Sequence, residues 1–170
     1  MPPPTTDAVV AAVAVSGVLA AAIDVRTRRI PNLATLGVAG VGLGLSATGA
    51  SGHTAVAALA GLVLGLLLML PGHLFGATGA GDVKLFAAMG TLLGPGAVLS
   101  AFLYTAIAGG ILAFAIAVRR RRLIETVGSV ATLVASRGAH SVAIEAPHRH
   151  NRFAYAPAIA VGTLLAALGV

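Results

Sequence analysis

The stretch GATGAGDVKLFAAMGTLLGPGAVLSAFLYTAIAGGILAFAIAVRRRR, residues 76–122, holds two apolar runs separated by GPG and ends in four arginines. Suppose that the first run, Gly76 to Leu93, entered a membrane and returned on the same side. The second run, Ala97 to Val118, would then carry the four arginines to the outside. Lys and Arg strongly favour the cytoplasmic side of membrane proteins. We therefore expect both runs to cross the membrane in full.

The composition of the whole chain predicts an integral membrane protein. Of its 170 residues, 58% are hydrophobic and 9% are charged, and the mean hydropathy is +0.97. This is too little polar side chain to coat a soluble globule. We expect a single all-α, polytopic membrane domain over residues 1–170, with about six transmembrane helices near these apolar runs: Ala8 to Ile23, Leu33 to Ala47, Ala55 to Leu70, Gly76 to Leu93, Ala97 to Val118 and Phe153 to Val170.

The distribution of basic residues predicts the orientation of these helices. With six crossings and both termini outside, the cytoplasmic segments are 24 to 32, 71 to 82 and 119 to 152, and all eleven Lys and Arg lie on or beside them. We infer a multi-pass protein of the cytoplasmic membrane, with its basic side on anionic lipid headgroups. The net charge of +6 does not require a nucleic-acid partner, since the sequence has no aromatic-rich basic surface or recognition motif.

The longest polar interval, residues 119–152, is expected to lie at the cytoplasmic surface. Four apolar residues recur there at helical spacing, which predicts an interfacial amphipathic helix: Leu123, Val127, Val130 and Val134. His148 and His150 follow in a loop with no acidic or thiol partner, so we predict no metal site and no cofactor. The chain has no cysteine, which excludes disulfides and thiol nucleophiles.

Two apolar runs carry glycines at the small-xxx-small spacing that lets helices approach closely in lipid. These are Gly40 and Gly44 in GVGLG, and Gly61 and Gly65 in GLVLG. We expect both pairs to be helix-packing positions.

Two of the five acidic residues lie at the expected membrane boundary, where an ionisable group indicates function. Asp24 follows the first apolar run in AAIDVRTRRIPNLATL, residues 21–36. It could be a plain interfacial carboxylate paired with nearby arginines. Asp82 follows Gly79, Ala80 and Gly81, and these glycines leave space beside its carboxylate. It could also cap the following helix, which is compatible with a catalytic role.

The predicted topology brings Asp24 and Asp82 to the same side of the membrane. Two carboxylates within hydrogen-bond range share one proton, so the pair holds an acid and a base. Such a pair can activate water and protonate a departing amide nitrogen. The helix start favours Asp82 as the ionised member. Lys84 lies about 200° from Asp82 around a helix, so we interpret it as an interfacial anchor or lipid-phosphate contact.

These segments resemble a known family. DVRTRRIPN and GATGAGDVKLFAAMGTLLG are similar to the two signature segments of the prepilin peptidases, the second being their GxGD motif, and RFAYAPAIAVG resembles their last helix. The resemblance implies that Asp24 and Asp82 are the catalytic pair, with Gly79, Gly81 and Lys84 as motif support. It also implies prepilin or pseudopilin substrates, cleaved at the cytoplasmic face.

The chain lacks the cysteine-bearing insert of the larger members of that family. We therefore expect peptidase activity without N-methylation, as in the compact members that serve Flp-type tight-adherence pili. Three alternatives stay open: a related GxGD protease such as a preflagellin peptidase, a small proton-conducting transporter, and a non-enzymatic subunit of a secretion machine.

Overall fold

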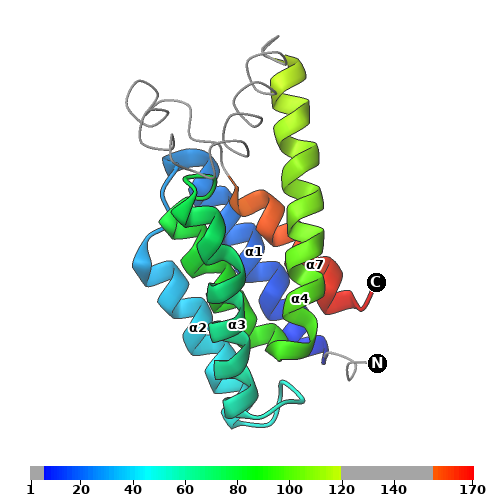
Figure 1. Cartoon of the computed structure of the whole chain (residues 1–170). Helices are drawn as coiled ribbons and strands as arrows, with labels where there is room; N and C mark the ends of the chain where they lie inside the picture. The colour runs from blue at the N-terminus through cyan, green and yellow to red at the C-terminus, as the bar shows by residue number, and fades with distance from the viewer. Residues whose placement is uncertain (1–5, 120–154) are drawn as a thin grey trace.

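The computed structural model describes residues 6–119 and 155–170, and every regular element in them is a helix (Figure 1). The all-α prediction is confirmed for these residues. The interfacial helix predicted in 119–152, together with His148 and His150, lies outside them apart from Arg119. The helices are α1 Asp7–Thr27, α2 Asn32–Ala47, α3 Ala55–Leu74, α4 Ala80–Arg119 and α7 Ala156–Leu168.

Three segments are long and apolar enough to cross a membrane: Asp7–Thr27, Ala55–Leu74 and Ala80–Ile116. The apolar helices α2 and α7 are shorter. The predicted count of six spans, the placement of both termini outside and the assignment of residues 1–170 to one domain therefore stay predictions.

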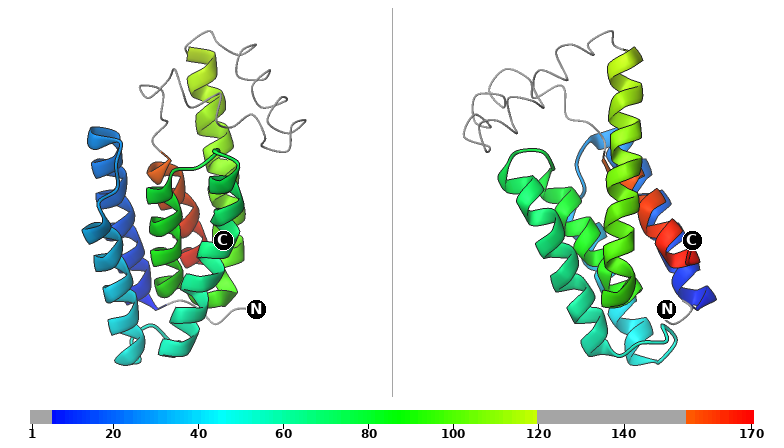
Figure 2. Two further views of the ribbon diagram at one scale, coloured as in Figure 1. Left: turned by 60° about the vertical axis from the view of Figure 1, so that its left-hand side comes forward. Right: turned by 45° about the vertical axis from the view of Figure 1, so that its right-hand side comes forward.

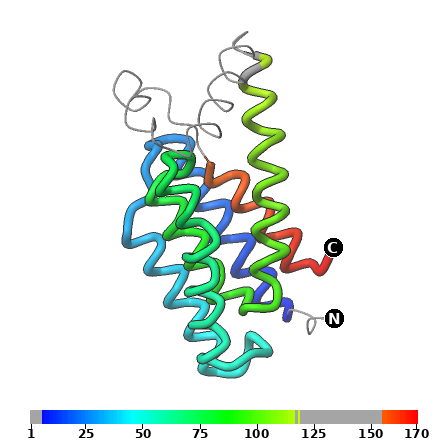
Figure 3. Tube along the Cα trace, viewed as in Figure 1, coloured from blue at the N-terminus to red at the C-terminus, as the bar shows by residue number. Residues whose placement is uncertain are grey.

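Helix α4 is broken at Gly94, where the sequence predicted the boundary between two apolar runs. Gly94 has φ 68° and ψ 171°, a conformation that is essentially restricted to glycine. Pro95 follows it and has no N–H to continue the helical hydrogen bonds. The chain reverses here, so that the two halves of α4 run in opposite directions (Figure 3).

The loop between α2 and α3 supports this reversal. Nε2 of His53 lies 3.2 Å from the carbonyl oxygen of Thr91 and can donate a hydrogen bond to it. In a continuous helix, the N–H of residue 95 would bond this oxygen, but residue 95 is proline. His53 therefore supplies the donor that Pro95 lacks.

The first half of α4 forms the centre of the bundle. Residues 85–94 are all buried, which explains why this stretch is apolar around its whole circumference. Among the described helices, α3 packs most extensively against α4, and glycines on both helices form the contact. A Cβ on Gly61 would lie 2.1 Å from the carbonyl oxygen of Gly90, so neither helix tolerates a side chain at this crossing.

The structure confirms one of the two predicted glycine pairs and corrects the other. Gly61 and Gly65 both face the backbone of α4. Gly40 and Gly44 of α2 would place a Cβ in open space, so the prediction that they pack was wrong. Gly42 between them is the contact residue, since a Cβ there would lie 2.0 Å from Oγ1 of Thr91.

Helix α7 connects the two parts of the bundle that carry the acidic residues. It packs against both α1 and α4, whereas α1 and α4 contact each other at few points (Figure 2). Gly17 of α1 permits this approach, because a Cβ there would lie 3.0 Å from Cβ of Ala160.

Candidate active site

Asp24 lies on the buried face of α1. It continues a row of buried residues that recur every three or four positions: Val9, Val13, Gly17 and Ala20. Asp24 itself is 5% exposed. Its Oδ2 accepts a hydrogen bond of 3.1 Å from the backbone N–H of Ala156, the first residue of α7. The carboxylate therefore points into the bundle and does not follow the neighbouring arginines to the surface.

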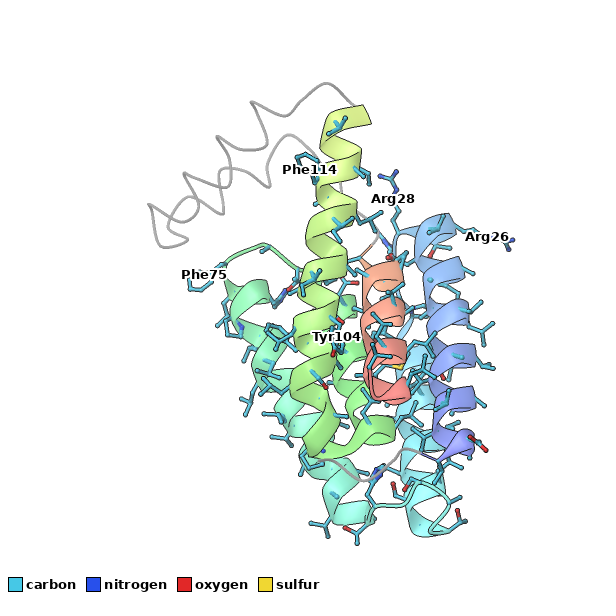
Figure 4. The ribbon with its side chains drawn as sticks, turned by 90° about the vertical axis from the view of Figure 1, so that its right-hand side faces the viewer. Arg26, Arg28, Phe75, Tyr104 and Phe114 are labelled. Carbon is cyan, nitrogen blue, oxygen red and sulfur yellow. The ribbon has the colours of Figure 1, made fainter. Side chains whose placement is uncertain are left out.

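The arginines after Asp24 are exposed. Arg26 and Arg28 point away from the bundle at the end of α1 (Figure 4). α1 ends because Arg28 takes a left-handed conformation, with φ 51°, and its N–H bonds the carbonyl oxygen of Asp24. Pro31 then disfavours helix at Ile30. This geometry leaves Asp24 in the last turn of α1, facing α7.

Asp82 is the third residue of α4 and is partly buried. Its Oδ2 accepts a hydrogen bond of 3.1 Å from the N–H of Gly79, the residue before the helix. An acidic residue at the third helical position commonly reaches back in this way. The predicted capping role is thus present, and the carboxylate lies at the positive end of a helix dipole.

The two glycines of the GAGD tetrad have different roles. A Cβ on Gly79 would lie 2.9 Å from Oδ2 of Asp82, so a side chain there would displace the carboxylate. A Cβ on Gly81 would lie 3.2 Å from Cβ of Ile30, in the connection between α1 and α2. Gly81 therefore lets the segment that follows Asp24 lie directly against the start of α4.

Lys84 adds a second contact between these segments. Its Nζ donates a hydrogen bond of 3.1 Å to Oδ1 of Asn32, the first residue of α2. The lysine is exposed and has this partner within the protein, while its contact with lipid phosphate stays a prediction. The two sequence segments that predicted the site thus meet at one end of the bundle, around Gly81 and Lys84.

Tyr155 is a site residue that sequence reasoning missed. It precedes Ala156, whose N–H bonds Asp24, and burial, followed by the charge of Asp82, raises the pKa of its own phenol. The dipeptide Tyr155 and Ala156 therefore bonds one acidic residue and lies in the electrostatic field of the other. The available signal was the likeness of RFAYAPAIAVG to a family's last helix, together with an aromatic residue that carries a hydroxyl at a helix start.

The described residues contain no group of three His, Asp or Glu side chains that could hold a metal ion. His73, near the end of α3, bonds within its own connection, with Nδ1 3.0 Å from the carbonyl oxygen of Thr78. The described ionisable side chains at this end of the bundle thus include two carboxylates, a phenol, the exposed Lys84 and His73.

Comparison with known proteins gives one family match. The model of the type IV leader peptidase family matches residues 11–114, which include both Asp24 and Asp82. No curated protein and no solved structure gives a significant match.

Proposed function

The chain belongs to the type IV leader peptidase family, and we propose that it is a membrane aspartic endopeptidase with Asp24 and Asp82 as its catalytic residues. Family membership implies a peptidase that acts on protein substrates. The finer proposal is that it removes the leader of type IV prepilins of the Flp kind, at the cytoplasmic face of the cytoplasmic membrane.

The position of the two aspartates at one end of the bundle is the observation that supports the catalytic pair best. Asp24 bonds Ala156, and Gly81, which precedes Asp82, lies against Ile30 in the segment that follows Asp24, although the two aspartates are 58 residues apart in the chain. In the proposed reaction, one carboxylate removes a proton from water, and the resulting hydroxide attacks the scissile carbonyl carbon. The other carboxyl group protonates the amide nitrogen as the C–N bond breaks.

The structure changes the argument over which aspartate begins ionised. Position at a helix start favoured Asp82 on sequence grounds. Asp24 receives the same kind of support, because its carboxylate accepts the first N–H of α7. The helix-dipole argument therefore no longer separates the two residues, and we assign the proton to the pair.

The basic end of the bundle supports the proposed substrate side. Arg26, Arg28 and Arg29 are exposed at the end of α1 that adjoins Asp24. The positive-inside tendency places such residues in the cytoplasm, beside anionic headgroups. A leader that approaches the membrane from the cytoplasm would meet the end of the bundle that carries the two carboxylates before it meets the opposite end.

The test is leader cleavage in cells that co-express this chain and an Flp-type prepilin, with the mature N-terminus identified by mass. Asp24→Asn and Asp82→Asn should each lower cleavage by about 10³-fold or more, with unchanged protein abundance. Asp7→Asn is the matched control, because Asp7 is exposed at the opposite end of α1. Substantial cleavage by either active-site variant would refute the catalytic pair. Cleavage of a preflagellin but of no prepilin would assign the chain to the related GxGD peptidases instead.

A further inference from the structure

The start of α7 has the geometry of a support for the catalytic carboxylates. The first N–H groups of any helix have no partner within that helix. In α7, the first of them bonds Oδ2 of Asp24 in a buried position. α1 and α4 contact each other at few points, and α7 packs against both of them.

Tyr155 is held against the second half of α4. A Cβ on Gly109 would lie 2.4 Å from Cε2 and 2.7 Å from the hydroxyl oxygen of Tyr155, so the ring occupies the space that this glycine leaves. The hydroxyl lies 3.4 Å from the carbonyl oxygen of Thr105. Ring and hydroxyl are thus located by the second half of α4, whereas Asp82 lies at the start of the first half.

We propose that Tyr155 is a positioning residue of this peptidase: its ring and hydroxyl anchor the start of α7 on the second half of α4, so that the following N–H orients Asp24. This inference rests on the proposed function. The hydroxyl acts through the position of α7 and does not itself exchange protons with the substrate. Gly109 is part of the same arrangement, because only a residue without a side chain leaves room for the ring of Tyr155.

Three variants separate this role from plain packing. Tyr155→Phe keeps the ring and removes the hydroxyl, and we expect leader cleavage to fall about ten-fold. Gly109→Ala pushes the ring away without touching either aspartate, and a displacement of about 1 Å near a reacting group can lower the rate about 10²-fold. Gly110→Ala is the matched control, since a Cβ there meets nothing within 4 Å.

The decisive measurement separates kcat from KM for a purified Flp-type prepilin and follows the thermal unfolding of the same variants. A carboxylate that is present but misoriented slows the chemical step, so Tyr155→Phe should lower kcat while KM and Tm stay close to those of the wild type. A merely structural role would lower Tm and the folded fraction. A fall in Tm that accounts for the lost activity, or wild-type cleavage by both Tyr155→Phe and Gly109→Ala, overturns this inference without touching the proposed function. A wild-type protein that cleaves no prepilin overturns the proposed function first.

Discussion

Replacement of Gly61 by Ala should separate α3 from α4 and destabilise the bundle. The added Cβ would lie 2.1 Å from the carbonyl oxygen of Gly90, against an ordinary contact distance of 3.4 Å or more. The two backbones must therefore move apart by about 1 Å, and such a gap forfeits a quarter to a half of the dispersion attraction along the interface. The loss is large because α3 packs on α4 more extensively than any other pair of described helices does.

The net effect follows from two opposing terms. Overpacking of this kind costs about 1–3 kcal/mol, and the loosened interface adds to it. Alanine recovers about 1 kcal/mol through its higher helix propensity. We expect a net destabilisation of about 2 kcal/mol, which corresponds to a fall in Tm of roughly 4–8 °C for a chain of this size.

Thermal unfolding followed by circular dichroism in detergent measures this loss directly. Gly44→Ala on α2 is the control, because it adds the same methyl group at a helical position that faces open space. That variant should be neutral or slightly more stable than the wild type. A Gly61→Ala protein that unfolds with the same Tm as Gly44→Ala would refute the close crossing of α3 and α4.

Two further predictions concern contacts at opposite ends of the bundle. Asn32→Ala, Lys84→Ala and the double variant should show a coupling energy of about 0.5–1 kcal/mol in thermal unfolding, and additive effects would contradict the hydrogen bond between these residues. His53→Ala should cost about 1–3 kcal/mol because it leaves the buried Thr91 carbonyl without the donor that Pro95 cannot supply. His53→Gln can still donate, so a Gln variant as unstable as the Ala variant would argue against this explanation.

The sequence predicted the helices well because their boundaries depend on local chemistry. The pre-proline position at Ile30, the GPG at 94–96 and the glycines before Asp82 all limit helix through backbone conformation, which short segments reveal. The rarity of acids in an apolar chain likewise singled out Asp24 and Asp82. These signals need no knowledge of how the helices pack.

The packing faces of the helices could not be predicted in the same way. In lipid, an outward residue is as apolar as a buried one, so hydrophobic periodicity carries little contrast. Val18 and Leu36 are 67% and 68% exposed, although they resemble core residues in type. The incorrect prediction for Gly40 and Gly44 has this cause, since spacing alone did not show which face of α2 meets α4.

Tyr155 escaped prediction because its role depends on a contact between distant parts of the chain. It is separated from Asp82 by 73 residues and carries no formal charge that would mark it in an apolar sequence. Only the packing of α7 between α1 and α4 brings its ring onto α4 and the following N–H onto Asp24. The two signature segments thus supply the carboxylates and join through Gly81 and Lys84, but a segment outside both of them holds Asp24 in its buried orientation. It follows that a chain with both segments intact and an altered start of α7 would keep the acids and lose their arrangement.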